Sequence, residues 1–204
     1  MNTFKLAVLV SGRGSNLQAI IDSIEREELD ASISIVISNT RDAMALQRAK
    51  EHEIKTIFID PAKHIDSKEY DKALTDKLKE YSIDLICLAG YMRILGEEVI
   101  QTFEKKIINI HPSLLPAFPG LNAQKQAIEH GVKFSGCTVH FVDLGVDSGP
   151  IILQTVVPVY DKDDEKSLSK RILEQEHHLY PKAIKMIKEG KVNLNGRIVT
   201  SNTI

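Results

Sequence analysis

The chain has 204 residues, of which 43% are hydrophobic and 26% are charged, which is typical of a globular protein and excludes disorder, collagen and coiled coil. Its 26 Lys and Arg residues nearly balance 28 Asp and Glu residues, giving a formal net charge of −2. This balance, without a basic stripe, disfavours a nucleic-acid or membrane-surface role. A chain of this length forms one domain or two small ones.

Two cysteines and the apolar segments bear on location. Cys87 and Cys137 each lie inside an apolar run, which predicts two buried free thiols rather than a disulfide. The apolar run at residues 4–10 is too short for a signal peptide, and no run approaches the ~20 apolar residues that span a bilayer. We therefore expect a cytoplasmic protein that binds neither membrane nor nucleic acid.

Short apolar runs alternate with amphipathic segments along most of the chain. Strands are predicted at residues 4–10, 33–37, 55–59, 83–89, 107–110, 137–141 and 151–159. Helices are predicted after a cap at Asn16 and at residues 42–50, 70–81, 124–129 and 166–189, with a kink at Pro181. Residues 112–120 hold three prolines and are expected to be irregular. Because the early strands are each followed by a helix-length segment, the pattern indicates an α/β, doubly wound parallel sheet in a single domain over residues 1–204.

A glycine-rich turn, Ser11-Gly12-Arg13-Gly14-Ser15-Asn16, joins the first strand to the first helix. Glycines permit a tight turn, and the N–H groups and dipole at a helix start attract an anion, so the turn is a candidate phosphate site. It is not a P-loop, because no Gly-Lys-Ser/Thr follows, and Leu17 stands where a dinucleotide fingerprint has its third glycine. A plain β–α turn is the alternative.

Asn109 and His111 lie two residues apart at the end of a predicted strand, so their side chains point to the same side. A carboxamide beside an imidazole can stabilise an oxyanion and move a proton. A polar strand end is the alternative. The irregular segment that follows favours a functional site, since long irregular loops in compact domains are often functional.

A third candidate segment runs from Val139 to Pro150. Asp147 is suited to orient or charge-stabilise an imidazole. Asp143 is expected to bond its own loop backbone. His140 lies inside a strand and is expected to be a hydrogen-bonded core histidine.

The last long helix carries several polar groups. Glu174 and Glu176 predict a solvated helix face, and His177 and His178 point about 100° apart, so they cannot chelate one ion. No His-Glu-x-x-His or Cys-x-x-Cys motif occurs, and we predict no metal.

Together, residues 11–18, 88–95, 109–120 and 136–150 resemble the phosphoribosylglycinamide formyltransferases, folate-dependent enzymes of purine biosynthesis. The run from Asn109 to Pro116 marks the wider formyltransferase superfamily, and Gln175-Glu176-His177 followed by Tyr180-Pro181 points to this member. The resemblance covers about residues 5–190. It implies a Rossmann-like, mostly parallel sheet with an antiparallel addition near the C-terminus, and a cis bond between Leu115 and Pro116.

The resemblance also implies site residues. The catalytic residues would be Asn109, His111 and Asp147. The phosphate of glycinamide ribonucleotide would be bound by Gly14, Ser15 and Asn16, and its ribose hydroxyls by Glu176. The folate would be bound, largely through backbone groups, by Lys68, Met92, Arg93, Ile94, Leu95, Asn109, Asp143, Leu144, Gly145, Val146 and Asp147. Leu144 stands where relatives often carry an acidic residue. Residues 1–108 would mainly bind the ribonucleotide, and residues 109–204 would mainly bind folate and carry catalysis.

The implied reaction transfers the formyl group of 10-formyltetrahydrofolate to the amine of glycinamide ribonucleotide, with no metal. Asn109 and protonated His111 would donate to the charge that develops on the formyl oxygen, while Asp147 favours the imidazolium and relays a proton. The enzyme would act as a monomer or homodimer.

Three alternatives remain. A formyltetrahydrofolate hydrolase would use the same trio on water, and a methionyl-tRNA formyltransferase would add an RNA-binding domain; the chain length disfavours both. A noncatalytic nucleotide-binding module would keep the glycine turn but leave Asn109, His111 and Asp147 unexplained.

Overall fold

A computed structural model describes residues 3–201 of the chain. The chain divides into two compact units, residues 1–108 and residues 109–204, and the division falls inside one strand, β5 (Ile107–His111). The strands form a seven-stranded sheet in the order β3-β2-β1-β4-β5-β6-β7 and a separate two-stranded sheet. The strand β1 pairs in parallel with β2 and β4, as β2 does with β3, and β6 pairs with β7 antiparallel. The expected mostly parallel sheet with an antiparallel addition is confirmed.

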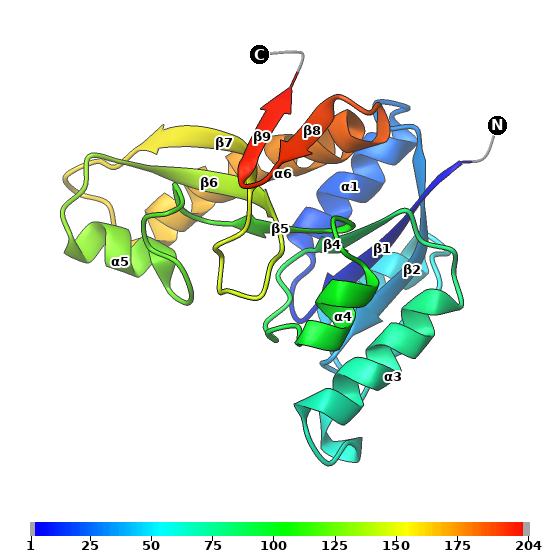
Figure 1. The fold of residues 1–204 in the computed structure, drawn as a ribbon. Helices are drawn as coiled ribbons and strands as arrows, with labels where there is room; N and C mark the ends of the chain where they lie inside the picture. The colour runs from blue at the N-terminus through cyan, green and yellow to red at the C-terminus, as the bar shows by residue number, and fades with distance from the viewer. Residues whose placement is uncertain (1–2, 202–204) are drawn as a thin grey trace. The chain divides into compact units, whose positions relative to one another are not determined.

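The first unit alternates strands and helices along the chain (Figure 1). Its elements are β1 (Phe4–Val10), α1 (Ser15–Glu25), β2 (Ala31–Ser38), α2 (Met44–Glu51), β3 (Thr56–Phe58), the 3₁₀ turn η1 (Pro61–Lys63), α3 (Ser67–Lys79), β4 (Leu85–Leu88) and α4 (Glu97–Thr102). β1 is the inner strand, since Val8 pairs with Val36 of β2 on one side and with Cys87 of β4 on the other.

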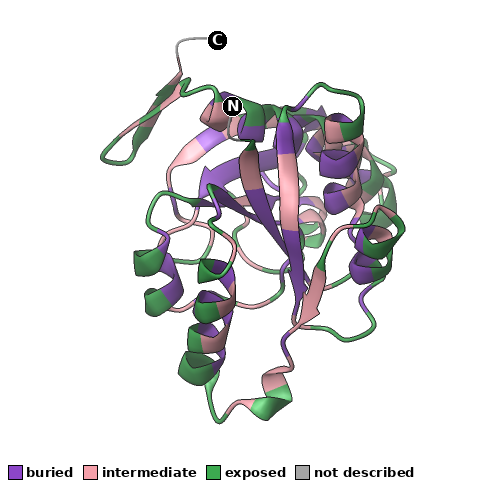
Figure 2. Ribbon diagram, turned by 90° about the vertical axis from the view of Figure 1, so that its right-hand side faces the viewer, coloured by how far each residue is buried: buried purple, intermediate pink, exposed green. Residues whose placement is uncertain are grey.

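Burial explains the sequence of this central strand. Residues Leu6 to Val10 of β1 are fully buried, which is why the strand is a continuous apolar run rather than an alternating one. In Figure 2 the strands of the sheet are largely purple, whereas α3 is purple along one side and green along the other. The helices therefore cover the sheet with one apolar face each.

The second unit is built on antiparallel strands and one long helix. After the last residues of β5 come α5 (Ala123–Glu129), β6 (Phe134–Phe141), β7 (Ile151–Pro158), α6 (Glu165–Lys188), β8 (Val192–Asn195) and β9 (Ile198–Ser201). α6 packs against both β6 and β7. Asp164 caps α6 in a reciprocal capping box with Ser167, which defines where the helix begins.

Most predicted elements are found within a few residues of their expected bounds, but three points differ. The cap of α1 is Gly14, not Asn16, because Gly14 adopts the left-handed backbone (φ 75°) that the sharp turn into the helix requires. Helix α4 was not predicted. The hairpin of β8 and β9 was also missed, although its Asn195-Gly196 turn is a strong hairpin signal.

Three smaller expectations are confirmed: the irregular prolyl segment, the cis peptide bond and the two buried thiols. Residues 112–120 form neither helix nor strand, and the Leu115–Pro116 bond is cis. Both cysteines are buried and neither forms a disulfide. Among residues 3–201, no helix is both long and apolar enough to cross a bilayer.

Candidate active site

The prolyl loop, residues 112–120, is held by hydrogen bonds as well as by its prolines. The Thr138 hydroxyl on β6 donates to the Ser113 carbonyl at 2.7 Å and accepts from the Leu115 N–H at 3.1 Å. The Gln154 amide on β7 donates to the Leu115 carbonyl at 2.9 Å. The antiparallel pair thus fixes the loop that directly follows His111.

Asp147 stands at the centre of a polar cluster in the second unit. One carboxylate oxygen, Oδ2, lies 3.1 Å from Nδ1 of His111 and accepts the Gly120 N–H at 2.8 Å. The other, Oδ1, accepts from the Asn109 amide at 3.2 Å. The structure therefore brings together the three side chains that the sequence singled out, within direct hydrogen-bonding reach.

Both ring nitrogens of His111 face an acceptor. Nε2 lies 2.8 Å from the Phe118 carbonyl, and Nδ1 faces the Asp147 carboxylate. A neutral imidazole donates from only one nitrogen, so the two contacts together fit the imidazolium. Burial acts the other way and lowers the pKa of His111, while the Phe118 carbonyl and Asp147 partly offset it. Desolvation therefore disfavours the protonated ring, whereas the contacts with Phe118 and Asp147 favour it.

The Asp147 carboxylate is kept ionised. Burial alone would raise its pKa, but its pairing with His140, the Gly120 N–H and the nearby His111 outweigh burial and lower the pKa of Asp147 below its usual value. Its backbone is left-handed, with φ 49°, a conformation that Asp tolerates better than most residues. The chain therefore bends at the residue whose charge organises the cluster.

His140 is a fourth member of the cluster. As expected it is a buried, hydrogen-bonded strand histidine, with Nδ1 2.8 Å from the Phe141 carbonyl. Sequence reasoning missed that its other nitrogen, Nε2, lies 3.3 Å from the Asn109 amide and 3.6 Å from Asp147. The signal that could have found it was the single histidine in a strand with no acidic residue, lysine or arginine.

The segment from Asp143 to Asp147 forms a loop after β6. Asp143 accepts from the Gly145 N–H at 3.1 Å and from the Ser148 hydroxyl at 2.7 Å, which confirms that it bonds its own loop. Leu144 and Val146 are exposed. The exposed apolar side chains and the nearby backbone suit contact with a flat ligand.

The glycine turn, residues 11–16, lies in the first unit at the start of α1. Gly14 is buried and left-handed, and a Cβ built there would lie 2.6 Å from the Cβ of Ala45 on α2. The helix's first internal bond joins the Gln18 N–H to the Gly14 carbonyl, so Ser15 and Asn16 lie in the first turn of the helix. This is the geometry of an anion-binding helix start.

The segment from Met92 to Leu95 is tied at both ends. The Met92 N–H donates to the Ser11 hydroxyl at 2.8 Å, and the Gly96 N–H donates to Asp71 on α3 at 2.9 Å. Between them the Arg93 guanidinium lies 4.1 Å from the ring centre of Tyr70. Ile94 is exposed and Leu95 is buried.

Two further predicted residues lie on helices. Glu174 is exposed as expected of a solvated face, but Glu176 is 6% exposed, so that expectation is wrong for Glu176. It lies near Cys137, whose pKa is raised by burial, and further by the charge of Glu176, to about 12. Lys68 lies exposed in the first turn of α3. No cluster of His, Cys, Asp and Glu that could hold a metal ion occurs within residues 3–201.

The sequence model of the formyl transferase family matches residues 4–184. The chain therefore belongs to the formyl transferase family. Over nearly its whole length it is similar to the phosphoribosylglycinamide formyltransferase of Haemophilus influenzae, with 44% identity over 95% of this chain and 92% of that protein. A crystal structure of glycinamide ribonucleotide transformylase 1 from Symbiobacterium toebii matches with a TM-score of 0.96 and 48% identity, covering 98% of this chain and 94% of that one.

A longer relative matches too. The trifunctional purine biosynthetic protein adenosine-3 of Drosophila melanogaster is 47% identical over 91% of this chain. The chain spans 14% of that protein, so the similarity concerns one part of it.

Proposed function

We propose that this chain transfers the formyl group of 10-formyltetrahydrofolate to the amine of glycinamide ribonucleotide. The observation that carries the proposal is the convergence of Asn109, His111 and Asp147, which offers two polarised donors beside one ionised carboxylate. The family and the names of its full-length relatives support this choice of substrates.

In the proposed reaction the amine attacks the formyl carbon and negative charge develops on the formyl oxygen. Asn109 and His111 donate to that oxygen, and Asp147 stabilises the imidazolium and helps to carry the proton from the amine to the leaving N10. Holding both substrates in place supplies much of the remaining acceleration.

The hydrogen bonds of the cluster explain how the donors discriminate between ground state and transition state. The His111 Nε2 proton is directed to the neutral Phe118 carbonyl, and the Asn109 amide contacts Asp147 and His140. A formyl oxygen must compete with these partners, and an oxygen carrying negative charge competes better than a neutral one. The interaction therefore strengthens as the reaction proceeds, which is what lowers a barrier.

The substrate sites remain proposals. We place the ribonucleotide phosphate at Gly14, Ser15 and Asn16, the ribose at Glu176, and the pterin along residues 92–95 and 143–147, with Lys68 near the folate. The tied ends of residues 92–95 support a rigid backbone for reading a planar ring. We place residues 1–108 mainly with the ribonucleotide and residues 109–204 mainly with folate and catalysis, in a cytoplasmic monomer or homodimer.

Formyl transfer is tested by mass spectrometry of reactions that contain 10-formyltetrahydrofolate, with and without glycinamide ribonucleotide. We expect formylation of the ribonucleotide by the wild type, and a fall in kcat of ~10²–10³-fold in His111→Ala with little change in ribonucleotide affinity. The control His178→Ala removes an exposed histidine of α6 in the same unit and should keep full activity. Release of formate without transfer would instead identify a hydrolase, and wild-type kcat in His111→Ala would remove His111 from the mechanism.

A further inference from the structure

Helix α2 contacts the glycine turn at two consecutive peptide groups. The Ala45 N–H donates to the Gly12 carbonyl at 3.0 Å, and the Nε of Arg48 donates to the Arg13 carbonyl at 2.9 Å. One turn of α2 separates Ala45 from Arg48, so a single face of this helix carries both donors. Nothing in the local sequence of the turn indicates this support.

These contacts set the direction of the turn's N–H groups. In a planar trans peptide the C=O and the following N–H point in opposite directions. Fixing the Gly12 and Arg13 carbonyls toward α2 therefore directs the N–H groups of Arg13 and Gly14 away from it. The Gly14 carbonyl accepts the Gln18 N–H within α1, so the Ser15 N–H points in the direction opposite to that carbonyl.

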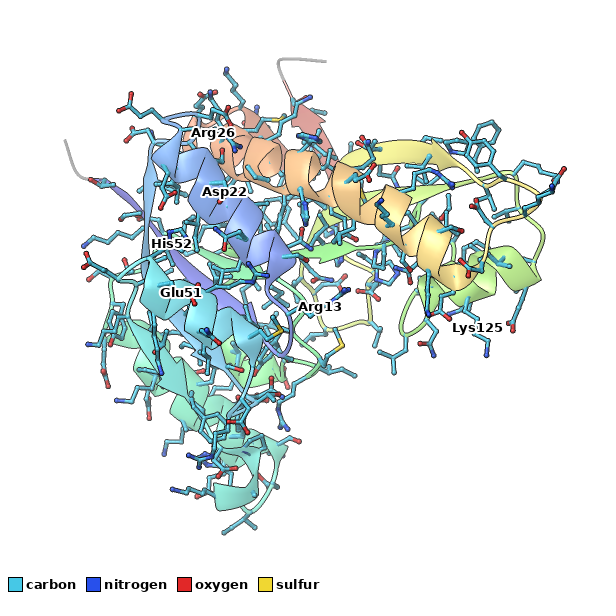
Figure 3. The ribbon with its side chains drawn as sticks, turned by 180° about the vertical axis from the view of Figure 1, so that it is seen from behind. Arg13, Asp22, Arg26, Glu51, His52 and Lys125 are labelled. Atoms are coloured by element: carbon cyan, nitrogen blue, oxygen red, sulfur yellow. The ribbon has the colours of Figure 1, made fainter. Side chains whose placement is uncertain are left out.

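Arg48 is itself held by a chain of side-chain hydrogen bonds. Its Nη1 donates to the side-chain oxygen Oε1 of Gln18 at 3.2 Å, and the side-chain nitrogen Nε2 of Gln18 donates to Asp22 at 2.8 Å and lies 3.1 Å from Nε2 of His52. His52 in turn lies 2.7 Å from Glu25. In Figure 3 Asp22 lies on α1 and His52 at the end of α2, while Arg13 lies at the start of α1. The guanidinium is thus fixed from α1 while it holds the turn.

We propose that Arg48 is a positioning residue for phosphate recognition: by holding the Arg13 carbonyl, it orients the backbone N–H groups that bind the phosphate of glycinamide ribonucleotide. The inference rests on the proposed function, since it takes the ribonucleotide phosphate as the ligand of the turn. Arg48 acts through the backbone, so it affects ribonucleotide binding and leaves folate binding and the chemical step unchanged.

The test compares three variants. Arg48→Ala removes the contact, Arg48→Lys keeps the charge but offers one point donor instead of the guanidinium fork, and Lys50→Ala removes an exposed charge from the same helix without touching the turn. For each we measure kcat, the KM for each substrate and the dissociation constant of glycinamide ribonucleotide by calorimetry. Thermal unfolding reports folding, and if Arg48→Ala does not fold, Arg48→Met keeps the apolar stem and takes its place.

For Arg48→Ala we expect the ribonucleotide KM and dissociation constant to rise about tenfold, the loss expected for one charged hydrogen bond. The folate KM and kcat should stay within about twofold. Arg48→Lys should lie between Arg48→Ala and the wild type, and Lys50→Ala should match the wild type.

Unchanged ribonucleotide affinity in a folded Arg48→Ala or Arg48→Met variant would overturn the positioning role while leaving the proposed function intact. An equal loss in Lys50→Ala would also overturn it, because the effect would then be a general charge attraction. A wild-type protein that does not formylate the ribonucleotide would overturn the proposed function, and with it this inference.

Discussion

Gly14 is the position at which a single added methyl group should separate ribonucleotide binding from the rest of the reaction. Its backbone is left-handed, which costs an L-residue ~1–2 kcal/mol. The new Cβ would also lie 2.6 Å from the Cβ of Ala45, so that contact has to lengthen before it reaches an ordinary van der Waals distance. Overpacking of this kind adds ~1–3 kcal/mol.

The two costs together predict that Gly14→Ala lowers the free energy of unfolding by roughly 2–5 kcal/mol. The corresponding loss in Tm is at least ~4 °C for a chain of this length. Because the turn must move away from α2, its N–H groups move with it, and displacements approaching 1 Å cost up to ~10²-fold. We expect a rise of at least ~10-fold in the ribonucleotide KM, with the folate KM nearly unchanged.

Two other glycines provide matched controls. At Gly12 an added Cβ meets nothing within 4 Å and the backbone is not left-handed, so Gly12→Ala should stay within about 0.5 kcal/mol of the wild type. At Gly90 the backbone is left-handed (φ 72°) but the space is open, so Gly90→Ala isolates the conformational cost of ~1–2 kcal/mol. The reasoning is refuted if Gly14→Ala is as stable as Gly12→Ala and binds the ribonucleotide as the wild type does. A failure of folate binding with normal ribonucleotide binding would show that the two substrate sites are exchanged.

The remaining predictions concern charged groups. Burial lowers the pKa of His111 from its usual 6.5, so the unfolded chain binds that proton more readily than the folded chain. The free energy of unfolding should therefore fall as pH drops below about 6.5. Urea unfolding at several pH values should show a smaller fall for His111→Asn than for the wild type. Asp147→Asn keeps the size of the side chain but removes the charge that favours the imidazolium, so kcat should fall by ~10²-fold or more with ribonucleotide affinity retained; an unchanged kcat would contradict the proton relay. Asp163→Ala should lower Tm by roughly 4 °C or more, since Asp163 holds a bidentate pair with Arg171, whereas Asp161→Ala, which removes an exposed ion pair, should leave Tm nearly unchanged.

What the sequence predicts well is what depends on local pattern. The apolar run at residues 4–10 predicts a buried strand, and the long amphipathic segment around Leu168 and Ile172 predicts a helix with one buried face. Both predictions succeed because the spacing of apolar residues along the chain follows the face that each element buries. Asn109 and His111 were found because alternation in a strand places both on one side. Helix α4 was missed because its six residues bury only Val99 and Ile100, too few for a clear period.

What escapes the sequence depends on contacts between distant segments. The buried Glu176 looks like any surface glutamate until α6 is packed on its strands. His140 joins the polar cluster around Asp147 through contacts with Asn109 and Asp147, both more than five residues away along the chain. Arg48 donates to the Arg13 carbonyl, 35 residues earlier in the chain. A sequence motif does not predict this bond, because any residue at position 13 would offer the same backbone carbonyl.

The two buried thiols can report the local opening of the protein. Cys87 lies in the first compact unit and Cys137 in the second, both with fully buried side chains, so an alkylating reagent reaches either one only when its surroundings open. Each unit thus carries one protected nucleophile, and mass spectrometry of peptides after timed alkylation reads the opening of the two units separately in one sample. Substrate-dependent slowing at one cysteine but not the other would show which half of the chain each substrate stabilises, without any engineered label.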